Sequence, residues 1–86
     1  MKKIVFSRHA EYKIQVLIRH QVNVDKSLIE KIISKPGRVE NGYKNRLIAQ
    51  GQLDEYHVLR IVYEESEEEI KIITIYPGRR SRYEKD

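Results

Sequence analysis

The chain has 86 residues, a formal net charge of +4 at pH 7 and no cysteine. This length fits a single domain spanning residues 1–86, and without cysteine neither disulfides nor thiolate metal ligands can form. The apolar run near the N-terminus stops at Ser7, which is too short for a signal peptide or a membrane span. We therefore expect a cytoplasmic protein without membrane contact.

The first half of the chain predicts one strand and two helices. Lys3 to Phe6 is typical of a short edge strand. Ser7 is suited to cap a helix from about Arg8 to His20, and Asp25 is suited to cap a second helix that ends at Pro36-Gly37. Apolar residues at helical spacing predict one buried face on each helix: Ala10, Ile14, Leu17 and Ile18 on the first, and Leu28, Ile29, Ile32 and Ile33 on the second.

After Gly37 the periodicity indicates strands. We expect them at Arg38 to Glu40, Arg46 to Gln50, Tyr56 to Tyr63 and Glu69 to Tyr76. The links between them are short, which favours antiparallel pairing. The last two strands are apolar at both parities, as in strands covered on both faces. The predicted fold is α+β, of order β-α-α-β-β-β, with an αα-hairpin packed on one face of an antiparallel sheet.

Charge is distributed unevenly along the chain. Five glutamates lie between Glu64 and Glu69, whereas three arginines follow the last predicted strand: Arg79, Arg80 and Arg82. Such a division makes one pole of a protein attractive to polyanions and the other repulsive. The glutamate run itself is the usual pattern of a solvated surface.

Two segments near the C-terminus carry a resemblance to a known family. Leu59-Arg60-Ile61-Val62-Tyr63 and, after a turn, Ile72 to Arg80 resemble the RelE/ParE superfamily of bacterial and archaeal toxins. Members carry an aromatic-Arg-apolar-apolar-Tyr strand, then an apolar strand that ends in Gly-Lys-Arg, and a later Tyr. The opening Phe6-Ser7-Arg8-His9-Ala10 is similar to a Ser-x-His-Ala domain family, and BrnT-type toxins are a further neighbour.

The resemblance implies a RelE-like fold and the toxin of a type II toxin–antitoxin pair, an endoribonuclease that cuts mRNA without a metal or cofactor. It places the family's phosphate-binding arginine at Arg60 and favours Arg80 for transition-state stabilisation. The implied partners are RNA, including mRNA on the ribosome, and an acidic antitoxin protein. Tyr83 lies closer to Arg80 than the family's catalytic tyrosine does.

The residues themselves supply the chemistry that such cleavage needs: a base, cations and an acid. Arg60 interrupts an apolar strand, so its charge faces a ligand or a partner, or faces solvent on a half-open sheet, or pairs with a glutamate in a buried position. His57, His9 and Tyr83 are candidates for proton transfer. The candidates for holding RNA are Lys44, Arg46, Arg79 and Arg82. Lys44 and Arg46 are equally suited to protect an edge strand from aggregation.

Two other functions stay open at this point. One is a non-catalytic RNA- or ribosome-binding module of the same fold, and the other is a toxin that acts on a protein such as gyrase. The three histidines are scattered and lack metal-ligand spacing. A P-loop, a dinucleotide fingerprint and a nucleophile elbow are all missing from the sequence.

Overall fold

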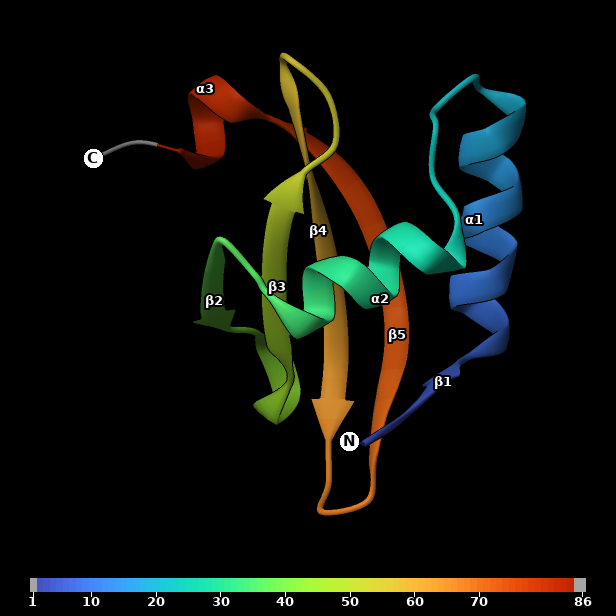
Figure 1. Ribbon diagram of the computed structural model, residues 1–86, viewed down its shortest axis with the longest axis vertical. Coiled ribbons are helices and arrows are strands. Elements are labelled where there is room, and N and C mark those ends of the chain that lie inside the picture. Colours follow the sequence, from blue (N-terminus) through green and yellow to red (C-terminus); the bar gives the residue numbers. More distant parts are fainter. Residues whose placement is uncertain (1, 85–86) are drawn as a thin grey trace.

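Five strands form one sheet in the computed structural model, which describes residues 2–84. Their bounds are Lys3–Phe6 (β1), Arg38–Asn41 (β2), Leu47–Gln52 (β3), His57–Glu65 (β4) and Glu69–Arg79 (β5). In space the order is β1-β5-β4-β3-β2. The α+β class is therefore confirmed, and β4 and β5 are the long inner strands, as their apolar sequences predict (Figure 1).

The sheet is mixed, which corrects the expectation of a purely antiparallel one. Strand β1 pairs parallel with β5, while β2, β3, β4 and β5 pair antiparallel in sequence. Short links dictate pairing only between consecutive strands, and β1 and β5 are separated by the rest of the chain. Four strands follow the two long helices, one for each of the four ranges predicted there, so the order β-α-α-β-β-β is one strand short. Pro77 and Gly78, beyond the predicted end of the last strand at Tyr76, lie within β5.

Two helices, α1 (Arg8–Arg19) and α2 (Lys26–Ser34), cover one face of this sheet. Both predicted caps are confirmed: the Ser7 Oγ accepts a hydrogen bond from the Ala10 amide at 3.0 Å, and the Asp25 Oδ1 accepts one from the Leu28 amide at 2.8 Å. The helices do not form the expected αα-hairpin. Helix α1 runs lengthwise beside β5, whereas α2 crosses the sheet over β3 (Figure 1).

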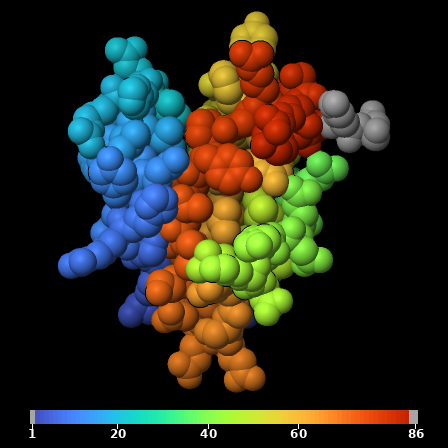
Figure 2. Space-filling view, turned by 180° about the vertical axis from the view of Figure 1, so that it is seen from behind, coloured from blue at the N-terminus to red at the C-terminus, as the bar shows by residue number. Residues whose placement is uncertain are grey.

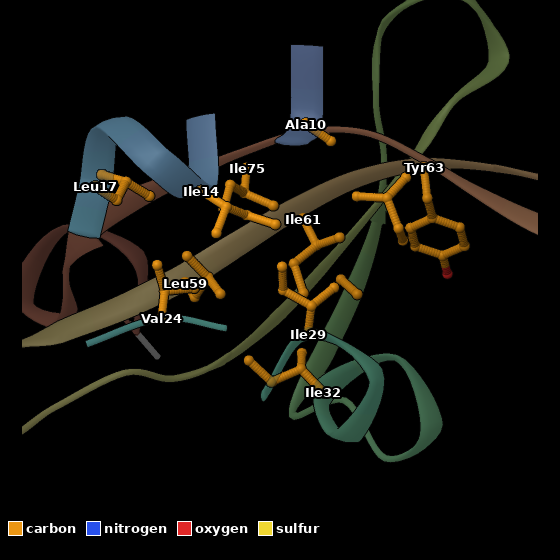
Figure 3. Close-up of a cluster of buried hydrophobic side chains, with 12 residues drawn as sticks. Ala10, Ile14, Leu17, Val24, Ile29, Ile32, Leu59, Ile61, Tyr63 and Ile75 are labelled. Atoms are coloured by element: carbon orange, nitrogen blue, oxygen red, sulfur yellow. The ribbon is translucent and has the colours of Figure 1, made fainter. Parts of the chain in front are cut away.

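The core fills the space between these helices and the sheet. Side chains of α1 and α2 point toward one face of the inner strands (Figure 3). Gly51 in β3 permits the closest approach, because a Cβ at that position would lie 2.6 Å from Ile32 Cγ1. The buried cluster is apolar apart from one tyrosine hydroxyl and includes Ala10, Ile14, Leu17, Ile29, Ile32, Leu59, Ile61, Tyr63, Ile72 and Ile75. Polar side chains that could form a functional site therefore lie on the opposite face of the sheet and at its ends.

A single helical turn, α3 (Arg80–Tyr83), follows β5 directly and folds back toward the sheet. Its Tyr83 packs against Gly78, where a Cβ would lie 2.3 Å from Tyr83 Cε2. Helix α3 and the β4–β5 turn lie at opposite ends of the molecule (Figure 2). Among the described residues, no helix is long and apolar enough to cross a membrane.

Candidate functional site

Arg60 lies in the middle of β4 on the face away from α1 and α2, and only 5% of its surface is exposed. Its Nε donates to the Tyr76 hydroxyl at 3.0 Å and its Nη1 donates to Gln50 Oε1 at 2.6 Å. Its Nη2 forms an ion pair with Glu40 Oε1 at 2.5 Å. The ring of Tyr83 covers the guanidinium. Partners from four other elements, β2, β3, β5 and α3, thus enclose this charge.

These contacts stabilise the charged form of Arg60. Burial by itself lowers the pKa of a guanidinium, but the hydrogen bonds to Tyr76 and Glu40 outweigh it and raise the Arg60 pKa overall. The sequence leaves several environments open for the Arg60 charge. In the structure, Arg60 forms an ion pair with a glutamate, Glu40. A phosphate could reach Arg60 only after displacing Tyr83 or Glu40.

Tyr83 is held in place through its backbone as well as its ring. Its carbonyl oxygen accepts hydrogen bonds from Arg38 Nη1 at 2.7 Å and from Gln50 Nε2 at 3.4 Å. Within residues 2–84, its hydroxyl has no hydrogen-bond partner. The structure therefore brings Tyr83 to Arg60, where the ring makes the contacts and the hydroxyl does not.

A second cluster lies at the end of the sheet where β4 begins. Asp54 Oδ1 accepts hydrogen bonds from the backbone amides of Tyr56 and His57, each at 2.8 Å, and lies 2.9 Å from His57 Nδ1. The amide of Tyr56 first, and then the His57 side chain, lower the pKa of Asp54. An ionised carboxylate thus orients the imidazole through Nδ1, which leaves Nε2 for a ligand.

Arginines from the end of β5 complete this second cluster. His57 is paired with Arg79 across the β4–β5 ladder. Arg80 follows and is fixed by Glu84 Oε1 at 2.7 Å and by the Glu55 carbonyl at 3.0 Å. These residues line a pocket of about 640 Å³ together with Tyr56, Ser81 and others. We call this the His57 pocket, lined by Glu55, Tyr56, His57, Arg79, Arg80, Ser81 and Glu84.

The His57 pocket combines four kinds of chemical group. It has an imidazole oriented by a carboxylate, two guanidiniums, an aromatic ring that is 70% exposed at Tyr56, and two carboxylates. Guanidiniums bind phosphate oxygens with paired hydrogen bonds, and an exposed ring can stack on a nucleobase. Asp54 was missed at the sequence level. Its signal is the Asp-x-x-His spacing within a link between two strands.

Lys44 and Arg46 lie at the other end of the sheet. Their spacing of two residues predicts that both alternate onto one strand face and reach the same groove as Arg60, but Lys44 lies outside the strands. Lys44 lies in a short 3₁₀ turn, Tyr43–Asn45, with a φ of 58°. Arg46 precedes β3 and pairs with Glu64 at 3.2 Å. The left-handed backbone of Lys44 interrupts the alternation on which the prediction depended.

The remaining candidates are also separate from the His57 pocket. His9 is exposed in the first turn of α1, beside the β1 edge of the sheet, where the Ser7 amide donates to the Ile72 carbonyl. Arg82 is exposed on α3, with its guanidinium carbon 5.6 Å from the centroid of the Tyr83 ring. Of the sequence-predicted residues, the structure therefore groups His57, Arg79 and Arg80 in one place and Arg60 and Tyr83 in another.

No group of three or more His, Asp or Glu side chains suited to hold a metal ion occurs in the described part of the chain. Searches against protein-family models, curated proteins and solved structures returned no match.

Proposed function

We propose that this chain is a metal-independent endoribonuclease, the RelE-like toxin of a type II toxin–antitoxin pair in the cytoplasm, and that it cuts RNA in the His57 pocket. One observation carries the proposal: Asp54 orients the His57 imidazole 2.9 Å away, next to Arg79 and Arg80 in the same pocket. An oriented base beside two phosphate-binding cations is the arrangement that intramolecular RNA cleavage requires.

In the proposed reaction, His57 Nε2 removes the proton from a ribose 2′-hydroxyl. The 2′-oxygen attacks the adjacent phosphorus, and the bond from phosphorus to the 5′-oxygen breaks. Arg79 and Arg80 neutralise the charge that develops on the phosphorane oxygens. The leaving 5′-oxygen takes a proton from water, because the pocket is open to solvent. The products are a 2′,3′-cyclic phosphate and a 5′-hydroxyl, and Tyr56 is placed to stack on a neighbouring base.

In this proposal Arg60 and Tyr83 support the site and do not touch the substrate. Tyr83 anchors α3 on the sheet through Arg60, Arg38 and Gln50. Helix α3 begins at Arg80, so the anchor positions that residue together with the hydrogen bonds from Arg80 to Glu55 and Glu84. An acidic antitoxin would inhibit the enzyme by covering the arginines at this end of the molecule.

The proposal is tested by incubating the purified chain with end-labelled single-stranded RNA in EDTA, with and without ribosomes. We expect fragments that end in 2′,3′-cyclic phosphate, and a rate that falls about 10²–10⁴-fold in His57→Gln, the usual contribution of a general base. The matched control is His20→Gln, because His20 is an exposed histidine outside the pocket, at the C-cap of α1. Intact RNA in both reactions would refute the proposal.

A second candidate function is a non-catalytic RNA- or ribosome-binding module. The observation in its favour is that both arginines highlighted by the family resemblance already have partners within the chain: Arg60 pairs with Glu40 and Arg80 pairs with Glu84. For such a module, RNA binding would weaken steeply with salt, while the RNA would stay intact and His57→Gln would bind like the wild type.

A further inference from the structure

A second cavity, of about 760 Å³, lies between α2, β3 and α3. We call it the α2–α3 groove. Its walls carry Lys31, Lys35 and Arg38 along one side, and Gln52 and Tyr83 are among its other lining residues. Lys31 lies in the last turn of α2 and Lys35 is the residue that caps its C-terminus, and both line the cavity. Arg38 follows where β2 begins.

The positive charge of this groove is largely uncompensated. No salt bridge joins Lys31, Lys35 or Arg38 to a carboxylate within residues 2–84. Glu84, the one acidic residue among residues 2–84 that lines the groove, pairs with Arg80 at 2.7 Å. A cation near a helix C-terminus also interacts favourably with the helix dipole. That interaction accounts for Lys31 in the last turn of α2, but Arg38 lies beyond the helix.

The charges elsewhere favour this end of the molecule for a polyanion. At the opposite end, the β4–β5 turn (Figure 1) carries the glutamate run. Two of the basic residues near it are paired with these glutamates, Arg46 with Glu64 and Lys2 with Glu65. A strand of phosphates would be repelled from that turn and attracted to the α2–α3 groove.

The α2–α3 groove also adjoins the His57 pocket. Glu84 at the end of α3 lines both cavities, and Gln52 Nε2 in the groove donates to the carbonyl of Asp54 at 3.4 Å. A chain of nucleotides that leaves the His57 pocket therefore meets Lys31, Lys35 and Arg38 when it passes α3. All three residues are exposed on the surface. The two lysine side chains can follow a flexible backbone, whereas Arg38 is held by its hydrogen bond to the Tyr83 carbonyl.

We propose that the α2–α3 groove binds the phosphodiester backbone of single-stranded RNA next to the cleaved phosphate. This inference rests on the proposed function. It assigns to Lys31, Lys35 and Arg38 the strand-holding role that the sequence suggests for Lys44 and Arg46. The groove contacts phosphates and not bases, so it holds RNA of any sequence.

The test compares two variants that each remove two lysine charges. Lys31→Gln/Lys35→Gln alters the groove, and Lys13→Gln/Lys71→Gln is the matched control, since those lysines line neither the groove nor the His57 pocket. All binding is measured in the His57→Gln background, so that RNA is not consumed. The probe is a fluorescent twelve-residue oligouridylate, whose affinity is followed by anisotropy as a function of salt concentration.

We expect the plot of log affinity against log salt to become shallower by about 1.4 in the groove variant, because each phosphate contact on single strands contributes about 0.7. The control variant should keep the slope of the parent protein, and thermal unfolding should be the same in all three. An unchanged slope in the groove variant, or an equal change in the control, would overturn the inference. So would lysine-dependent binding of a polyglutamate peptide with lysine-independent binding of RNA, which would indicate an acidic protein partner.

Failure of the groove can be told apart from failure of the proposed function. If the wild type leaves RNA intact but the groove variant shows the shallower slope, cleavage is refuted and the groove stands as an RNA-binding site. If the wild type cuts RNA and the groove variant keeps the parent's slope of log affinity against log salt, only the inference about the groove is refuted.

Discussion

Arg60 and Tyr83 are stacked, with the guanidinium carbon 4.3 Å from the centroid of the tyrosine ring. The contact joins the middle of β4 to the C-terminal turn α3, which is only four residues long. So short a helix has little stability of its own, and its position depends on what it packs against. The stack therefore holds α3 in place together with the hydrogen bonds to the Tyr83 carbonyl and from Arg80, and it supports one wall of the His57 pocket.

Replacing Tyr83 should separate the structural role of its ring from any role of its hydroxyl. We expect Tyr83→Ala to lower the free energy of unfolding by about 1–2 kcal/mol, the value of a partly desolvated cation–π contact. Tyr83→Phe should be as stable as the wild type and equally active, because the hydroxyl has no partner within residues 2–84. Urea unfolding and the RNA assay measure the two effects. Full stability with lost activity in Tyr83→Phe would instead make the hydroxyl catalytic.

Gly78→Ala should disturb α3 from the other side of the same contact. The new methyl group would lie 2.3 Å from Tyr83 Cε2, so the ring must move, at a cost of about 1–3 kcal/mol. The double variant Gly78→Ala/Tyr83→Ala should be no less stable than Tyr83→Ala alone, since the clash disappears with the ring. A double-mutant cycle by urea unfolding measures this coupling. Simple additivity of the two single changes would contradict the predicted contact.

Arg60→Ala should act mainly on stability. The change leaves the Glu40 carboxylate and the Gln50 and Tyr76 side chains without their shared partner. We expect a loss of about 2–4 kcal/mol, at or below the usual cost of breaking a buried ion pair, because Glu40 is partly exposed. Circular dichroism and urea unfolding give the measurement. If the variant has wild-type stability and yet fails to cut RNA, Arg60 acts on the substrate directly.

The carboxylate of Asp54 gives the His57 pocket a defined response to acid. Its pKa lies below the ordinary value of 3.8, so the hydrogen bonds that it accepts are complete above that pH. They are lost only as the pH falls through the lower folded-state pKa. A carbon-13 NMR titration of the Asp54 carboxyl should have its midpoint below 3.8, and the amide signals of Tyr56 and His57 should shift with it. A midpoint at or above 3.8 would show that these hydrogen bonds are not formed in solution.

Local elements were predictable because their signals are contained in neighbouring residues. Ser7 and Asp25 each precede an amphipathic run, and each side chain accepts the hydrogen bond expected of a helix cap. The end of strand β5 was harder to predict. Pro77-Gly78 is typical of a turn in an isolated segment, but in the folded chain β4 supplies a hydrogen-bonded partner, so β5 continues to Arg79.

The candidate site, too, was predictable only in part. The residue types that suit RNA cleavage are evident from sequence, and so is the unusual place of Arg60 in an apolar strand. Whether that arginine faces a ligand or a glutamate depends on β2, which brings Glu40 to it from 20 positions earlier in the chain. The predicted positions of Lys44 and Arg46 differ from those in the structure because the chain makes a left-handed turn at Lys44. That turn depends on packing that no local sequence pattern reveals.

By itself, the sequence determined the α+β class, the two capped helices, the long inner strands and the separation of acidic from basic residues, because these depend on composition and on short periodicities. Only the tertiary structure decided that β1 runs parallel to β5, that Tyr83 closes over Arg60, and that His57, Arg79 and Arg80 share one pocket while Lys44 and Arg46 lie elsewhere. Those relationships join residues far apart in the chain, and they exist because burying the apolar faces of the helices and sheet leaves few ways to arrange the remaining elements.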